Sequence, residues 1–207
     1  MIGIIDYGMG NIRSVYHAFE MIAAEVTICN NPADLANAER IVLPGVGAFK
    51  DCIRNLRAGG FIDALHQAVF VQGKPILGIC LGMQAMARRS FEGGEHQGLG
   101  WINGDVVHLQ PSDVSLRVPH TGWNDIRFNP ECPLFEGLPA APDFYFVHSF
   151  YLKCDDDTDI VATCDYGKPL TAAICRGNIF ATQFHPEKSQ DYGMKLLENF
   201  INWKSSC

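Results

Sequence analysis

Residues 78–84 read Gly78-Ile79-Cys80-Leu81-Gly82-Met83-Gln84 and directly follow the apolar run Pro75-Ile76-Leu77. The run predicts a buried strand, and the glycines flanking Cys80 predict a sharp turn from that strand into a helix. A side chain at such a turn projects from the end of a sheet, and a helix N-terminus there would stabilise the thiolate. Cys80 is therefore a candidate nucleophile. The alternative is a buried, inert thiol, the usual fate of a free cysteine.

The chain around this turn alternates apolar runs with helical patterns. Runs at 2–5, 26–29 and 41–43 predict strands, and Asn11 is placed to cap a helix after the first of them. Helices are also expected at about 48–58 and 61–71. Strands separated by helices and buried on both faces predict a mostly parallel sheet with right-handed connections. Such sheets carry their sites at the carboxyl ends of the strands, where Cys80 falls.

The second half of the chain is richer in strands. Candidate strands cover 101–109, 144–151, 160–164, 170–175 and 179–184, and a helix is expected over about 190–203. The chain has 207 residues, 47% of them hydrophobic, which is enough for one good core, and it contains no repeat or linker. We therefore expect a single domain over residues 1–207, with an open, mixed α/β sheet flanked by helices.

Composition excludes several classes of function. The formal net charge is −7 and no run of Lys and Arg would follow a phosphate backbone, so we expect no nucleic-acid partner. No stretch of about eighteen apolar residues occurs and the N-terminus has no basic leader, which favours a soluble, cytoplasmic protein away from membranes. The eight cysteines include no CxxC pair, so we expect no metal site and no cofactor.

A histidine and a carboxylate follow the last candidate strand, in Gln183-Phe184-His185-Pro186-Glu187. A cysteine nucleophile needs such a pair: the histidine takes the thiol proton and later protonates the leaving group, and the carboxylate orients the ring. His and Glu after a strand are commonly just a polar loop, so the motif gains its value from Cys80. Together Cys80, His185 and Glu187 predict a catalytic triad.

These motifs resemble the class I glutamine amidotransferases, whose triad combines a Gly-x-Cys-x-Gly elbow with a later His-x-Glu. The resemblance narrows to the glutaminase subunits of imidazole glycerol phosphate synthases. It rests on further blocks that run in order along almost the whole chain: Pro44-Gly45-Val46-Gly47, Val118-Pro119-His120-Thr121-Gly122-Trp123-Asn124, Tyr145 to Phe150, and Phe184 to Ser189. Thr121 stands where we expect a methionine in that family.

The resemblance implies hydrolysis of glutamine through a γ-glutamyl thioester on Cys80. The backbone N–H of Leu81, beside the nucleophile, would stabilise the oxyanion, and a second donor would come from Val46 or Gly47. Because glycines flank Val46, that peptide can rotate, and we expect an oxyanion site that is incomplete until the segment flips.

The resemblance also implies contacts with the substrate. Gln84 and Glu92 would bind glutamine, and backbone groups of Ser149 and Phe150 would hold its head group. From the residues alone, Gln84 is equally a solvated helix residue, and Glu92 lies in a Gly-rich stretch where an exposed acid is the default.

The chain holds no acceptor for ammonia, so a partner subunit is implied. By resemblance this is a (β/α)8-barrel cyclase that forms a heterodimer with the glutaminase and makes imidazole glycerol phosphate and aminoimidazole carboxamide ribonucleotide in histidine biosynthesis. The expected docking residues are Asn11, Pro119, His120, Trp123, Asn124 and Lys188. Trp123 suits an interface anchor, although a Trp beside a Gly is as often plain core.

Three other readings remain open. A glutaminase subunit of a different synthase would carry another oxyanion segment in place of Pro44 to Gly47. A paralogue supplying ammonia for a surface sugar would share nearly every motif. A non-catalytic regulatory module would be expected to lose Cys80, His185 or Glu187, all of which are present.

Overall fold

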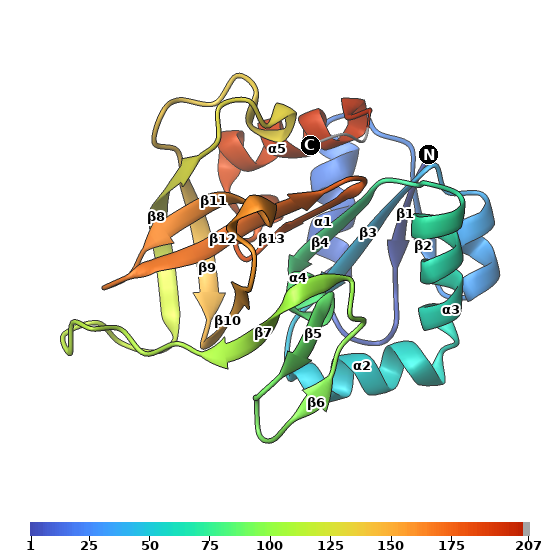
Figure 1. The fold of residues 1–207 in the computed structure, drawn as a ribbon. Coiled ribbons are helices and arrows are strands. Elements are labelled where there is room, and N and C mark those ends of the chain that lie inside the picture. The colour runs from blue at the N-terminus through green and yellow to red at the C-terminus, as the bar shows by residue number, and fades with distance from the viewer. Residues whose placement is uncertain (205–207) are drawn as a thin grey trace.

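Short Ile- and Val-rich runs form the parallel part of a nine-stranded sheet in the computed structural model, which describes residues 1–204 (Figure 1). The parallel strands are neighbours in the order β2-β1-β3-β4-β13. Their bounds are β1 Ile2–Ile5, β2 Val26–Cys29, β3 Arg40–Gly45, β4 Ile76–Cys80 and β13 Ile179–Thr182. β4 lies between β3 and β13, so the cysteine at its end has a neighbouring strand on each side.

The sheet continues with antiparallel strands in the order β13-β12-β11-β8-β9. These are β12 Pro169–Arg176, β11 Ile160–Asp165, β8 His120–Phe128 and β9 Asp143–His148. The mixed, open α/β sheet expected from the sequence is confirmed.

Helices cover both faces of this sheet (Figure 1). α1 (Ile12–Met21) and α5 (Gln190–Asn202) share one core, in which Phe19 and Phe200 are fully buried. α2 (Phe49–Ala58) and α3 (Phe61–His66) pack on the other face, through Phe49 and Phe61. α3 continues as a π-helical turn, Gln67–Val71, and short 3-10 helices lie at Pro32–Ala36, Pro133–Phe135, Asp157–Asp159 and Pro186–Lys188.

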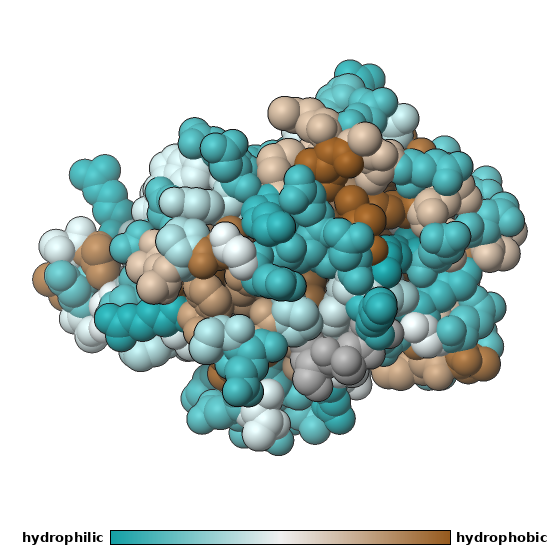
Figure 2. Space-filling model, turned by 90° about the horizontal axis from the view of Figure 1, so that it is seen from above, coloured by the Kyte–Doolittle hydropathy of each residue, from teal (hydrophilic) through white to brown (hydrophobic). Residues whose placement is uncertain are grey.

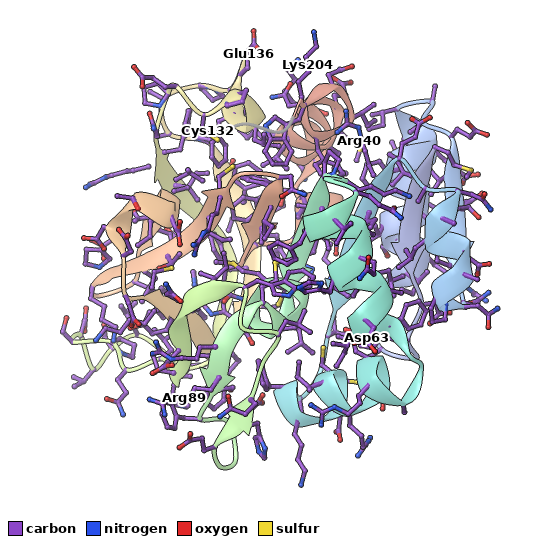
Figure 3. The ribbon with its side chains drawn as sticks, turned by 45° about the vertical axis from the view of Figure 1, so that its right-hand side comes forward. Arg40, Asp63, Arg89, Cys132, Glu136 and Lys204 are labelled. Atoms are coloured by element: carbon purple, nitrogen blue, oxygen red, sulfur yellow. The ribbon has the colours of Figure 1, made fainter. Side chains whose placement is uncertain are left out.

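A second, four-stranded sheet has the order β10-β7-β5-β6. Its strands are β5 Ala87–Ser90, β6 His96–Gln97, β7 Ile102–His108 and β10 Phe150–Cys154. Ion pairs connect two of its strands. The Asp105 carboxylate on β7 lies 2.8 Å from the guanidinium of Arg88 and 3.2 Å from that of Arg89, both on β5. Figure 3 shows Arg89 at the outer part of this sheet, where it also pairs with Glu95 at 3.1 Å.

The structure differs from the sequence-based expectation in three places. The run 144–151 is two strands, since the chain leaves the large sheet after His148 and enters the small one at Phe150, with Ser149 between them. Strands β5, β6 and β8 had no counterpart among the expected strands. Asn11 occupies the N-cap position of α1, but its side chain accepts a hydrogen bond from the Ser14 hydroxyl at 2.8 Å and none from the helix backbone.

The two ends of the parallel strands differ in what surrounds them. The carboxyl ends lie beside α4 (Leu81–Ala85) and the second sheet in the lower part of Figure 1. The opposite side, viewed from above in Figure 2, is mostly hydrophilic with small apolar patches. Among the described helices, none combines the length and the apolar character needed to cross a membrane.

Candidate active site

Cys80 occupies a strained turn between β4 and the five-residue helix α4, Leu81–Ala85. Its backbone φ of 53° with ψ of −107° lies in a region that residues other than glycine rarely adopt. Gly82 is required for the turn, because a Cβ at this position would overlap the carbonyl oxygen of Leu43 on β3. The predicted strand–turn–helix elbow is therefore present, with the thiol at the carboxyl end of the sheet.

His185 and Glu187 are held together beside the end of β13. Nδ1 of His185 lies 2.8 Å from Oε1 of Glu187, and each side chain is 1% exposed. The backbone N–H of His185 donates to the carbonyl of Tyr145 on β9 at 2.9 Å. Ser189 adds a second clamp, since its hydroxyl donates to the His185 carbonyl at 2.6 Å and accepts from the Tyr145 N–H at 3.0 Å. The connector is thus fixed to the large sheet.

The charge environment favours a protonated His185. Burial alone would lower its pKa, but interactions with the Cys80 thiolate and with Glu187 outweigh it and raise the pKa to about 9. Nε2 of His185 makes no hydrogen bond of standard geometry to any residue in 1–204, and neither does Oε2 of Glu187. Cys80 raises the pKa of His185 through its charge and its proximity, since the imidazole ring and the sulfur line the same pocket. The arrangement favours a protonated imidazole beside the Cys80 sulfur.

A pocket of about 380 Å³ joins the predicted residues. It is lined by Val46, Gly47, Cys80, Leu81, Gln84, Glu92, Pro119, Val147, His148, Ser149, Phe150 and His185. All of the predicted oxyanion and substrate residues are in this set, together with the sulfur and imidazole of the predicted triad. Glu187 is outside the set and contacts the pocket only through His185.

Two amide side chains connect the nucleophile to the far wall of the pocket. The Gln84 side-chain N–H₂ donates to the Phe150 carbonyl at 2.8 Å and to Oε1 of Gln183 at 3.0 Å. Gln183 in turn points its N–H₂ at the Cys80 sulfur, at 3.6 Å. Gln183 was not among the residues predicted from the sequence, because no local pattern marks it and its partner Cys80 lies far along the chain. His148, within the block 145–150, was not predicted either.

Glu92 has a structural partner as well as a place in the pocket wall. Its Oε2 accepts the backbone N–H of Phe49 at 2.7 Å, at the first turn of α2. A carboxylate at that point also offsets the positive end of the helix. The residue is therefore held in place rather than freely solvated.

The segment after β3 is anchored on one side and free on the other. The Tyr7 hydroxyl donates to the Pro44 carbonyl at 2.9 Å and accepts from the Cys52 thiol at 3.4 Å. Beyond this anchor, Val46 is 40% exposed and Gly47 has a φ of +103°. The segment thus has a fixed base and a tip whose backbone is free to adopt the unusual angles open to glycine.

The predicted docking residues do not line the pocket, with the exception of Pro119. Trp123 on β8 is 45% exposed and stacks edge-on against Tyr145, with ring centroids 6.0 Å apart. The Lys188 ammonium lies 5.8 Å from the centre of the same Tyr145 ring. His120, by contrast, is 3% exposed, so it is part of the interior. In the described part of the chain, no group of three or more His, Cys, Asp or Glu side chains is placed to hold a metal ion.

Comparison with known proteins places these observations in a family. Residues 3–203 match the family model described as glutamine amidotransferase class-I. The chain is 52% identical to "Imidazole glycerol phosphate synthase subunit HisH 1" of Campylobacter jejuni (strain RM1221), over 97% of this chain and 99% of that protein. It is 47% identical to the HisH subunit of Brucella suis biovar 1 (strain 1330), over 98% and 99% of the two chains.

Solved structures agree at the level of the fold. PurLQS from Thermotoga maritima aligns with a TM-score of 0.75 at 21% identity, covering 97% of each chain. A crystal structure described as glutamine amidotransferase aligns with a TM-score of 0.74 at 19% identity and the same coverage. With an elbow cysteine, a buried His–Glu pair and a family match over nearly all its length, the chain belongs to the class I glutamine amidotransferases.

Proposed function

We propose that this chain is the glutaminase subunit of an imidazole glycerol phosphate synthase, which releases ammonia from glutamine for a partner cyclase in histidine biosynthesis. The observation that carries the proposal is the Cys80–His185–Glu187 arrangement, in which a buried carboxylate holds a protonated imidazole beside a thiol at a strained elbow. The near full-length similarity to HisH subunits supports the choice of pathway.

The proposed chemistry is a two-step transfer. The Cys80 thiolate attacks the side-chain carbonyl carbon of glutamine, and the C–N bond breaks as His185 gives its proton to the departing nitrogen, which leaves as ammonia. His185 then takes a proton from water, the hydroxide attacks the γ-glutamyl thioester, and the C–S bond breaks to release glutamate. Glu187 keeps Nδ1 of His185 protonated throughout, so that Nε2 is the atom that exchanges protons.

The oxyanion of each tetrahedral intermediate requires donors. The backbone N–H of Leu81 is the first, and the peptide around Val46 and Gly47 supplies the second when it turns into the pocket that these residues line. One such donor is worth about 10²–10³ in rate, so rotation of this peptide acts as a switch. The anchored base at Pro44 confines the movement to the tip.

The docking surface proposed here comprises Asn11, Pro119, Trp123, Asn124 and Lys188. The half-exposed Trp123 ring and the Lys188 cation flank Tyr145, an aromatic and cationic composition that is typical of interface anchors. The proposed partner is a (β/α)8-barrel cyclase that receives ammonia directly. A protected route is needed because free ammonia in neutral water is mostly protonated and then not nucleophilic.

The triad is tested by labelling with a diazoketone analogue of glutamine. We expect the analogue to alkylate Cys80, glutamine to protect it, and Cys80→Ser to abolish the reaction. Cys154 is the matched control, because it is the more accessible of the described free thiols, and Cys154→Ser should leave labelling unchanged. Labelling located at Cys154 instead would mean that accessibility, not a glutamine site, directs the reagent.

Dependence on the partner is tested by steady-state glutamine hydrolysis. We expect slow turnover by the chain alone and at least about 10²-fold acceleration when the cyclase and its nucleotide ligand are added. Trp123→Ala should raise the cyclase concentration needed for half-maximal activation by about 30-fold, the cost of losing an anchor residue. Phe70→Ala removes an aromatic ring of similar exposure outside β8 and should have no effect. Fast hydrolysis without partner would contradict the switch.

A further inference from the structure

An uninterrupted series of hydrogen bonds runs from β8 to the wall of the pocket through two buried histidines. The Asn124 amide nitrogen lies 3.3 Å from Nε2 of His120, and Nδ1 of His120 lies 3.1 Å from Nε2 of His148. Nδ1 of His148 lies 3.0 Å from the Phe150 carbonyl oxygen. His120 and His148 are 3% and 6% exposed, so each ring must find its partners inside the protein.

The direction of every bond in this series is fixed by its two ends. The Asn124 amide nitrogen also donates to the Asp165 carbonyl at 2.9 Å, which identifies it as N–H₂, so Nε2 of His120 must accept. At the other end, a carbonyl can only accept, so Nδ1 of His148 must carry the proton. His148 Nε2 therefore accepts from His120 Nδ1–H. The series satisfies both nitrogens of both rings, with each imidazole neutral.

The surroundings keep both rings neutral. Burial lowers the pKa of His120 to about 4 and, with a contribution from His120 itself, lowers that of His148 to about 3. The His120 ring is also fixed sterically between Phe146 and Tyr166, whose ring centroids lie 4.7 and 4.0 Å away. A second proton on either ring would set N–H against N–H and break the series.

The series ends at two consecutive peptide groups whose carbonyl oxygens are both hydrogen-bonded. The Phe150 carbonyl oxygen accepts hydrogen bonds from Nδ1–H of His148 and from the Gln84 side-chain amide. The preceding carbonyl, that of Ser149, accepts the Leu109 N–H at 2.8 Å. These two residues form the junction between the two sheets and line the pocket beside Cys80. Their carbonyl directions therefore set which backbone groups remain to face a ligand.

We propose that Asn124, His120 and His148 are positioning residues that fix the Phe150 carbonyl, and with it the backbone at Ser149 and Phe150 and the Gln84 side chain, for binding the head group of glutamine. This inference rests on the proposed function for the identity of the ligand. None of the three side chains moves a proton in the reaction. Their role is to hold one edge of the binding pocket by a fixed, one-directional hydrogen-bond series that starts at β8.

The test compares two reagents that alkylate Cys80 in the full-length chain. The diazoketone analogue of glutamine uses the head-group contacts, whereas iodoacetamide does not, so the ratio of their rate constants reports on positioning. His120→Phe keeps an aromatic ring in the stack and removes both nitrogens. We expect the ratio to fall about tenfold, while the iodoacetamide rate stays within about twofold. Asn124→Ala, at the outer end of the series, should lower the ratio about threefold. This variant provides the test if His120→Phe does not fold.

Tyr166→Phe is the matched control, because it leaves a ring stacked on His120 and removes only a hydroxyl bonded to the Arg117 carbonyl. Its ratio should equal that of the wild type. If the wild type prefers the glutamine analogue and both variants keep that preference, the positioning role is wrong while the proposed function stands. If the wild type shows no preference, the proposed function itself fails, and this inference fails with it.

A spectroscopic measurement checks the geometry without any ligand. Imidazole nitrogen chemical shifts at pH 7 should show His120 and His148 as neutral rings with the proton on Nδ1. A proton on Nε2 of either ring, or a cationic ring, would overturn the proposed series even in a fully active protein. The chemical shifts thus test the geometry of the series, and the ratio of the two labelling rates tests its positioning role.

Discussion

Glu187 acts on His185 by charge as well as by geometry, and the two effects can be separated. Glu187→Gln keeps the size of the side chain but removes the charge that helps raise the pKa of His185. We expect that pKa to fall and the rate of partner-activated glutamine hydrolysis to drop by about 10²–10⁴. The pH profile of Cys80 alkylation by iodoacetamide measures the change directly.

The control for this change is Glu198→Gln. Glu198 pairs with Lys195 at 3.8 Å on the surface of α5, with 47% of its side chain exposed. Its removal should leave both the profile and the rate unaltered. An unchanged alkylation profile in Glu187→Gln would show that the carboxylate does not govern the charge of His185.

At this scale, sequence patterns predicted those residues whose chemistry is unusual for their position. The cysteine between glycines and the His-Pro-Glu connector can be recognised in the sequence, because each local pattern has a structural explanation. Gln183 and His148 carried no such sign. Their significance comes from partners far along the chain, such as Cys80 for Gln183, and a single sequence does not record those pairings.

α4 presses against β3 so closely that its second residue has no room for a side chain. In Gly82→Ala the new Cβ would meet backbone, which cannot rotate away as a side chain would, so α4 must shift from β3. We expect a loss of about 3 kcal/mol of unfolding free energy, measured by urea denaturation, and slower labelling of the displaced Cys80. Gly93→Ala is the matched control: it is strained by its φ of +65° but has open space, and should cost only about 1 kcal/mol. Equal losses would show that close packing is not the constraint.

The elements that were predicted are those with a strong apolar pattern. The parallel strands are buried on both faces and read as continuous apolar runs. β8 was missed because most of its nine residues are exposed or half-buried, among them Thr121, Gly122 and Asn124. The break at Ser149 was missed because both strands around it are apolar, and nothing local says that they enter different sheets.

The unfolding free energy of the whole molecule should pass through a maximum near pH 6.5. The reason is that folding lowers the pKa of two buried histidines, His120 and His148, and raises that of a third, His185. An unfolded histidine has a pKa near 6.5, while His120 and His148 fold with values of about 4 and 3. As pH falls below 6.5 the unfolded chain binds protons that the folded one refuses, so the unfolding free energy decreases. The limiting slope is about 1.4 kcal/mol per pH unit for each such ring.

On the alkaline side His185 dominates. Its folded pKa of about 9 means that the folded state keeps a proton which the unfolded chain releases, so stability falls as pH rises from 6.5 toward 9. Urea denaturation between pH 5 and 8.5 measures both limbs. We expect His185→Asn to flatten the alkaline limb, and His17→Ala, on the exposed face of α1, to alter neither. A stability that rises steadily with pH to 8.5 would contradict these assignments.

The pairing of β4 with β13 determines when the site can exist during synthesis and folding. Cys80 and Gln183 are 103 residues apart, and His185 and Glu187 come later still. Most of the chain must leave the ribosome before His185 can lie beside the Cys80 sulfur. Pairing of strands that are so far apart in the sequence is a slow step in folding. In the proposed mechanism, a nascent or partly folded chain therefore carries a cysteine without a proton acceptor, and it cannot consume glutamine before the sheet is complete.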